Sequence, residues 1–101
     1  MRESILDRLH RAPLVFDGAM GTMLYARGVF VNTCFDEVCL SRPSLVSEIH
    51  DAYVAAGADV IESNSFGANR IKLARYGLAD RVREINLAAA KLARTAAGDE
   101  V

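Results

Sequence analysis

Hydrophobic residues along the chain alternate between helical spacing and short unbroken runs. Apolar side chains that recur every three or four positions predict amphipathic helices. On this basis five stretches are predicted to be helical: residues 3–11, 20–27, 44–56, 69–76 and 81–97. Two short apolar runs bounded by turn residues, 14–16 and 59–63, predict buried strands. Residues 28–43 predict a long loop, which makes them a candidate for function.

Start and stop signals flank several of these predicted helices. Ser41 and Pro43 supply a start for the helix at 44–56, and Asp80 supplies an N-cap for the helix at 81–97. Glycine is favoured just after a helix because it adopts the left-handed conformation of a cap. The expected stops are Gly28, Gly57, Gly77 and Gly98.

The predicted elements follow one another as strand, helix, strand, helix, with extra helical turns. This alternation is typical of α/β proteins with parallel sheets. Two parallel strands do not make a stable sheet alone, because their edges and faces stay exposed. We therefore expect an α/β fold of which this chain forms a βαβα portion that is incomplete without further strands.

Composition and charge exclude several classes of protein. The 101 residues are 51% hydrophobic and 25% charged, which is typical of an ordinary globular domain. A net charge of −1 offers no electrostatic basis for binding nucleic acid or an anionic membrane. No apolar stretch approaches the roughly 20 residues of a membrane span, and the charged N-terminus does not resemble a signal peptide. We therefore expect a cytoplasmic protein that binds neither nucleic acid nor membrane.

Polar residues follow both predicted strands, at the end where α/β proteins bind their ligands. Asp17 and Gly18 follow the first strand, and Ser63 lies at the end of the second. The Asp17 carboxylate can hold an ammonium group, and the backbone N–H of Gly18 can meet a carboxylate. The three residues therefore suit an amino-acid ligand. The alternative is that Asp17 caps the next turn and Ser63 satisfies local backbone groups.

Other candidate residues give weaker patterns. Gly18, Gly21 and Thr22 partly resemble a phosphate loop, but no lysine follows Gly21. The two cysteines, Cys34 and Cys39, are not spaced as a zinc-ribbon pair and no second pair follows, so they predict reduced thiols in the loop rather than metal ligands. Two histidines complete the set: we expect His10 to be solvated and His50 to be half-buried on its helix.

Three segments of the sequence resemble the homocysteine S-methyltransferase family. They are VFDGAMGTML at 15–24, RPSLVSEIHDAYVAAGADVIESNSFGAN at 42–69 and EINLAAAKLAR at 84–94. The resemblance implies a (β/α)8 TIM barrel, of which residues 1–101 would be an N-terminal fragment containing the first two βα units. It also implies that L-homocysteine binds through Asp17 (amino group), Gly18 (carboxylate) and Ser63, which stands where the family usually has threonine. The stretch NRIKLARYGL at 69–78 is most similar to the branch fused to methylenetetrahydrofolate reductase.

The resemblance also implies a chemistry. In this family a zinc ion on three cysteines binds the homocysteine thiolate, which takes a methyl group to form methionine. Neither cysteine segment is present here, so the zinc ligands are expected beyond residue 101 and no metal ligand is assigned in this chain. The methyl donor stays open among methylcobalamin or methyltetrahydrofolate, S-methylmethionine, S-adenosylmethionine and betaine, as do C-terminal cobalamin, folate or reductase modules. The alternative is a truncated, non-catalytic protein that binds an amino acid or a partner.

Overall fold

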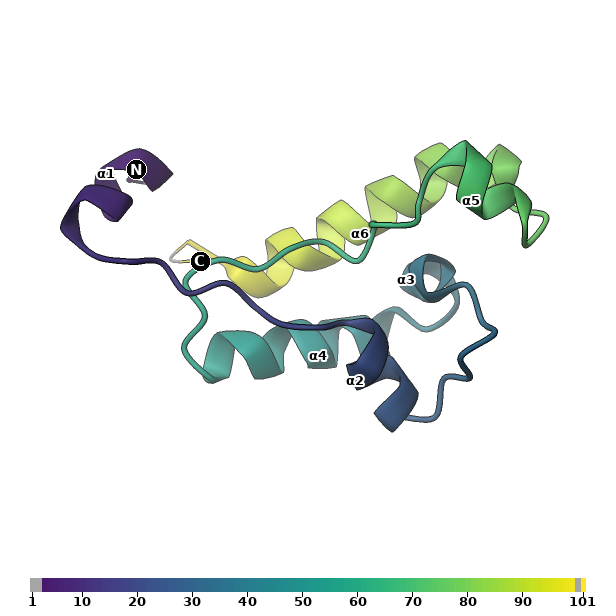
Figure 1. The fold of residues 1–101 in the computed structure, drawn as a ribbon, viewed down its shortest axis with the longest axis horizontal. Helices are drawn as coiled ribbons and strands as arrows, with labels where there is room; N and C mark the ends of the chain where they lie inside the picture. Colours follow the sequence, from purple (N-terminus) through teal and green to yellow (C-terminus); the bar gives the residue numbers. More distant parts are fainter. Residues whose placement is uncertain (1–2, 100) are drawn as a thin grey trace.

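The computed structural model describes residues 3–99 and 101, and these residues form a mainly helical, elongated molecule (Figure 1). The α-helices are α1 (Ile5–Arg11), α2 (Gly21–Ala26), α3 (Val38–Ser41), α4 (Pro43–Ala55), α5 (Arg70–Ala74) and α6 (Val82–Ala97). Two short 3-10 helices, η1 (Phe35–Glu37) and η2 (Ala79–Arg81), precede α3 and α6. Two connecting segments run between the helices: residues 12–19 form the first extended segment and residues 58–64 form the second, and residues 65–69 form a turn that leads into α5 (Figure 1).

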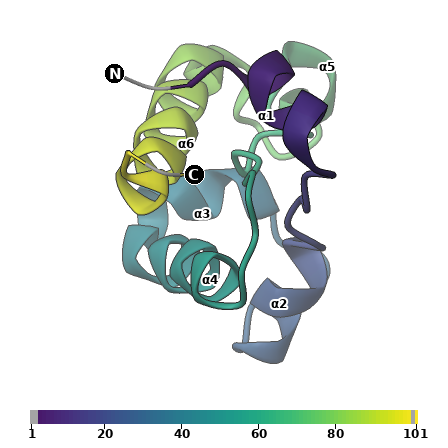
Figure 2. The ribbon, with the colours of Figure 1, turned by 90° about the vertical axis from the view of Figure 1, so that its left-hand side faces the viewer.

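The core lies where α4 and α6 pack side by side (Figure 1). Figure 2 shows these two helices along one side of the molecule, with α2 and the extended segments along the other. From α4 the buried side chains are Val46, Ile49 and His50, and from α6 they are Ile85 and Ala89. The larger cluster joins Val46, Ile49 and Ala89 to Leu24, Val29, Val38 and Cys39, whereas Ile85 belongs to a smaller cluster with Cys34, Ala68 and Leu73. The interior is therefore built mainly from helix contacts.

The expectation of a βαβα portion of a TIM barrel is wrong for the described residues. The segments predicted as strands meet in one parallel bridge, between Phe16 and Val60, and neither extends into a strand. Three backbone hydrogen bonds join them: Asp17 N to Val60 O (3.0 Å), Asp59 N to Val15 O (2.7 Å) and Val60 N to Val15 O (3.2 Å). The physical reason is that a parallel pair without neighbouring strands has too few partners to propagate a ladder.

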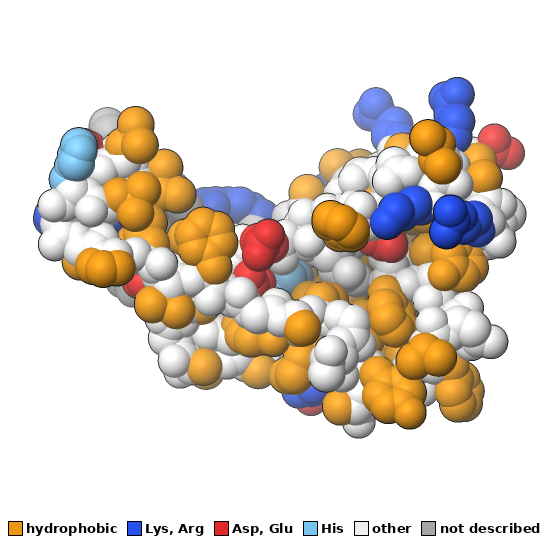
Figure 3. Space-filling view, viewed as in Figure 1, with side chains coloured by type: hydrophobic (Ala, Val, Ile, Leu, Met, Phe, Trp, Pro, Cys, Tyr) orange, Lys and Arg blue, Asp and Glu red, His pale blue; other side chains and the backbone are white. Residues whose placement is uncertain are grey.

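The two segments are also not buried as predicted. Val15 is 58% exposed and Phe16 is 52% exposed, so the first apolar run lies at the surface. The same holds for α1, none of whose side chains is buried. Figure 3 shows hydrophobic side chains gathered at this end of the molecule and again near α2. Among the described residues, no helix is both long enough and apolar enough to cross a membrane.

The helix predictions are confirmed, with ends shifted by a few residues. Helices are observed at Ile5–Arg11, Gly21–Ala26, Pro43–Ala55, Arg70–Ala74 and Val82–Ala97. Pro43 is the first residue of α4, as the start signal predicted. Gly57 has a φ of 104° and follows the α4 C-cap, so it supplies the left-handed turn that only glycine adopts without strain.

Three local predictions are wrong. The segment 28–43 is not wholly a loop, because it contains η1 and α3. Ser41 does not start α4: it ends α3, and its hydroxyl donates to the carbonyl of Glu37 at 3.4 Å. Asp80 does not cap α6, because the chain enters that helix directly from η2 with Arg81 at the N-cap position and no side-chain cap.

Candidate functional site

Asp17 is fixed to the second extended segment through both its backbone and its side chain. Its N–H donates to the carbonyl of Val60 at 3.0 Å, and its Oδ2 accepts from the backbone N–H of Glu62 at 3.0 Å. The other carboxylate oxygen, Oδ1, is buried and has no hydrogen-bond partner among the described residues. The carboxylate therefore has a defined orientation, with acceptor capacity left over for a cationic or N–H-bearing group.

Gly18 lies directly against a tyrosine side chain from α4. A Cβ atom at this position would lie 2.9 Å from the hydroxyl oxygen of Tyr53, which is closer than Cβ atoms come to other atoms in proteins. The same hydroxyl donates a hydrogen bond of 2.7 Å to the carbonyl of Ala19. Glycine is therefore needed at position 18 because α4 approaches the backbone closely. The N–H of Gly18 makes no hydrogen bond within the described part of the chain.

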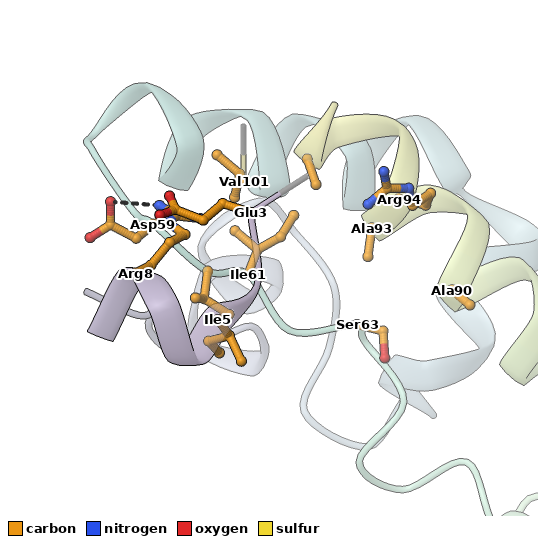
Figure 4. Close-up of a pocket in the computed structure, with 12 residues that line it drawn as sticks. Glu3, Ile5, Arg8, Asp59, Ile61, Ser63, Ala90, Ala93, Arg94 and Val101 are labelled. Atoms are coloured by element: carbon orange, nitrogen blue, oxygen red, sulfur yellow. Dashed lines mark hydrogen bonds and ion pairs between the residues drawn. The ribbon is translucent and has the colours of Figure 1, made fainter. Parts of the chain in front are cut away.

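Ser63 follows Glu62 but its hydroxyl is engaged elsewhere. The Oγ atom of Ser63 lies 2.6 Å from the Oγ atom of Ser65, so the two hydroxyls share a hydrogen bond. Ser63 lines a cavity of about 410 Å³ whose walls come from α1, the extended segment and α6. Figure 4 shows Ser63 near Ala90 of α6, apart from the Arg8–Asp59 ion pair of 3.4 Å on the other side of the cavity.

The structure thus brings the predicted site residues together only in part. Asp17 and Gly18 are adjacent in one turn, and the Glu62 N–H links Asp17 to the backbone next to Ser63. No hydrogen bond joins the Ser63 hydroxyl to the Asp17 carboxylate. The candidate phosphate loop has a simpler explanation, because a Cβ at Gly21 would lie 3.1 Å from the ring of Phe35. Packing against Phe35 accounts for that glycine.

His50 is influenced electrostatically by Asp17, which the sequence did not indicate. It is fully buried rather than half-buried, and neither ring nitrogen has a hydrogen-bond partner among the described residues. Burial lowers the pKa of His50, while the carboxylates of Asp17 and Asp51 act in the opposite direction. The imidazole is therefore neutral at pH 7, with one N–H donor and one nitrogen acceptor. His10, by contrast, is exposed as expected.

The two cysteines are buried free thiols in a segment tied to the second extended segment. The Cys39 Sγ atom lies 3.6 Å from both the carbonyl oxygen and the side-chain nitrogen of Asn64. Burial raises the pKa of the Cys39 thiol to about 11. A protonated thiol is a poor zinc ligand. Among the described residues, no group of three histidine, cysteine or acidic side chains lies close enough together to hold a metal ion.

A second cavity, of about 490 Å³, lies between the loop before α3 and the residues after the second extended segment. Asp36 joins the two sides of this cavity, because its Oδ2 atom accepts a hydrogen bond of 3.0 Å from the N–H of Gly67. Asn64 adds a hydrogen bond of 2.8 Å from its side-chain nitrogen to the carbonyl of Phe35. Sequence reasoning assigned no such roles to Asp36, Asn64 or Tyr53. Tyr53 lies within the helix predicted at 44–56, and Asn64 lies among the polar residues that follow the second predicted strand, but neither pattern indicates these contacts.

Comparison with known proteins matches the sequence of this chain to one family. The family model described as homocysteine S-methyltransferase matches residues 14–101, which include Asp17, Gly18, Ser63 and all of α4 and α6. The chain belongs to the homocysteine S-methyltransferase family. The resemblance drawn from the sequence motifs is therefore confirmed, and the match leaves only α1 and the residues around it outside the family segment.

Two relatives of this chain carry the name methionine synthase. The protein of Mycobacterium tuberculosis is 36% identical over 101 residues, and that of Mycobacterium leprae is 33% identical over 101 residues. Each alignment covers 94% of this chain and 8% of the relative. The chain thus spans a small part of the length of these two relatives.

Proposed function

We propose that this chain contributes to the amino-acid-binding part of a homocysteine S-methyltransferase. The substrate is L-homocysteine, and the product of the whole protein is methionine. Family membership supports the chemistry. The observation that carries the proposal is the turn at Asp17–Gly18, where an oriented carboxylate lies beside a backbone N–H that has no partner among the described residues. An α-amino acid has the complementary pair, an ammonium group beside a carboxylate.

Each of the three proposed site residues has a separate role. Asp17 accepts hydrogen bonds from the ammonium group, while the Glu62 N–H keeps its carboxylate in place. Gly18 donates its backbone N–H to the substrate carboxylate. Ser63 supports the substrate through its hydroxyl, which keeps hydrogen-bonding capacity beyond its bond to Ser65.

The proposed reaction transfers a methyl group from a donor to the homocysteine sulfur. The bond between the methyl carbon and the donor breaks, a sulfur–carbon bond forms, and the thiol proton is lost. The proposed donors are methylcobalamin or methyltetrahydrofolate, S-methylmethionine, S-adenosylmethionine and betaine. The first of these would come with a cobalamin or folate module elsewhere in a longer protein, and the relatives, of which this chain covers 8%, have room for such modules.

Zinc, which the family resemblance implies, does not fit the described residues of this chain. Burial raises the pKa of Cys39 to about 11, and no group of three candidate ligands is present in the part of the chain that the structure describes. We therefore assign no zinc ligand here and derive no step through a metal. The role proposed for this chain is to bind and orient the amino-acid end of the substrate.

Binding of L-homocysteine to the purified chain, measured by isothermal titration calorimetry, tests the proposal. The matched ligand is 4-sulfanylbutanoate, which lacks only the amino group. In the wild type, loss of the amino group should weaken binding by at least about tenfold, because Asp17 then has no cation to pair with. In Asp17→Asn the two ligands should bind about equally. Asp80→Asn removes an exposed carboxylate from η2 and should behave as the wild type.

Two results would count against the proposal. If the wild type binds both ligands equally well, Asp17 is not the ammonium site. If it binds neither, this chain holds no amino-acid site of its own.

A second candidate function is an amino-acid-binding or partner-binding protein without catalysis. The assay that separates the two measures methionine formed from L-homocysteine with each proposed methyl donor. Binding without methionine formation by any donor supports the non-catalytic function.

A further inference from the structure

His50 and Asp17 hold polar atoms that are buried without partners. Among the described residues, only three buried side-chain nitrogen or oxygen atoms have no hydrogen-bond partner: Oδ1 of Asp17 and both ring nitrogens of His50. These atoms belong to two residues that are 33 positions apart in the sequence, and the Asp17 carboxylate acts electrostatically on His50. Buried polar groups in proteins are almost always paired, so three such atoms in one electrostatically coupled pair call for an explanation.

The helix that carries His50 already holds the turn containing Asp17. One turn further along α4, the Tyr53 hydroxyl donates to the carbonyl of Ala19 at 2.7 Å and lies against Gly18. Both side chains therefore come from the part of α4 that faces residues 17–19.

The chemistry of the two groups is complementary. The carboxylate offers acceptors only, and a neutral imidazole offers one N–H donor. A hydrogen bond between an N–H and an ionised carboxylate is short and strong in a buried setting. Burial lowers the pKa of His50, so the neutral, single-donor form is the one present near pH 7. The charged groups that act on His50 are Asp17, from the segment after α1, and Asp51, from α4 itself.

We propose that His50 is a positioning residue for Asp17: an imidazole N–H donates to Oδ1, directly after a small rotation or across one water molecule. Oδ2, held by the Glu62 N–H, is then the oxygen presented to the ammonium group of the substrate. This inference rests on the proposed function for the identity of the ligand, but the pairing of His50 with Asp17 is a property of the chain without ligand.

The pairing is tested first without ligand, by nitrogen-15 NMR of the two imidazole rings. The chain has two histidines, so exposed His10 serves as the internal reference. We expect a single fixed tautomer of His50 in the wild type. Asp17→Asn should convert it to a mixture of tautomers and lower its titration midpoint, leaving His10 unchanged. Asp51→Asn is the matched control, which should lower the midpoint and leave the tautomer fixed. An unchanged tautomer in Asp17→Asn overturns the proposal.

The positioning role is then tested through binding of L-homocysteine. His50→Leu keeps a similar volume without a donor and should weaken binding about tenfold, the effect of losing one hydrogen bond to a charged group. His50→Asn and His50→Gln each place an N–H near one of the two ring-nitrogen positions, and one of them should restore most of the affinity. If both bind as weakly as His50→Leu while remaining folded by circular dichroism, the positioning role is overturned. If His50→Leu does not fold, the tautomer measurement decides.

The two proposals can fail separately. A wild-type chain that binds no L-homocysteine but shows the tautomer change in Asp17→Asn overturns the proposed ligand and keeps the His50–Asp17 pair. A chain that binds L-homocysteine through Asp17 but shows no tautomer change keeps the proposed function and overturns the role of His50.

Discussion

Replacing Gly18 with alanine tests the contact by which α4 holds the candidate site. The added Cβ would lie 2.9 Å from the Tyr53 hydroxyl oxygen, and 3.3 and 3.4 Å from two ring carbons. Only the hydroxyl is too close, so it has to move, and the movement breaks its 2.7 Å hydrogen bond to Ala19. Overpacking costs about 1–3 kcal/mol and a lost hydrogen bond about 1 kcal/mol. We expect Gly18→Ala to lower the free energy of unfolding by about 2–3 kcal/mol.

Removing the hydroxyl first should remove most of this penalty. Tyr53→Phe alone loses one hydrogen bond, at a cost of about 1 kcal/mol. In that background the new Cβ meets only the ring, and the further cost of Gly18→Ala should fall to about 1 kcal/mol. The double variant should therefore be more stable than the sum of the two single changes predicts, by about 1–2 kcal/mol.

Urea unfolding of the four chains, followed by far-ultraviolet circular dichroism at micromolar concentration, measures this coupling. Tyr25→Phe is the matched control, since Tyr25 is 58% exposed, and it should change stability by less than about 0.5 kcal/mol. If the Gly18 and Tyr53 changes add to within about 0.3–0.5 kcal/mol, the two residues do not interact energetically and the reasoning is refuted.

Two further predictions concern the interior. Burial raises the pKa of Cys39 from 9.0 to about 11, so the folded state binds the thiol proton more tightly than the unfolded state. The resulting contribution to the free energy of unfolding, about 2–3 kcal/mol, is fully present below pH 9 and is lost as the pH rises towards 11. Urea unfolding across this range should show the loss in the wild type and not in Cys39→Ala. On α6, Ile85→Ala removes a fully buried side chain and should cost about 2–5 kcal/mol, whereas Leu87→Ala, at a half-exposed position, should cost less than about 1 kcal/mol. Equal losses in urea unfolding would contradict the observed packing of α6.

Helices were predictable from the sequence because their signals are local. The apolar positions of α4 and α6 recur within the helix itself, and Pro43 and Gly57 mark the ends of α4 within a residue or two. The sheet was not predictable in this way. A short apolar run predicts an extended segment, but a strand exists only where neighbours complete its ladder, and Phe16 and Val60 pair with each other alone.

In the candidate site too, only the residues with local sequence signals were predictable. Asp17 and Gly18 were identifiable because they are adjacent and follow an apolar run. The roles of Tyr53 and His50 depend on how α4 lies against residues 17–19, and no local pattern encodes that contact. His50 was expected to be half-buried because only its neighbours in the sequence could be considered. In the structure, packing of α4 against the rest of the molecule buries its side chain completely.

The contact between Asp36 and Gly67 limits which sequences this fold can accept. A Cβ at position 67 would lie 2.8 Å from the Oδ1 atom of Asp36, whose Oδ2 holds the Gly67 N–H. A larger residue at 67 therefore forces the Asp36 carboxylate to move, which disturbs its hydrogen bond to the backbone N–H of residue 67. Asn64 adds a bond to the same loop through the Phe35 carbonyl. Side-chain hydrogen bonds thus hold residues 35–36 and residues 64–67 together. Grafting either segment onto another scaffold therefore requires the other as well.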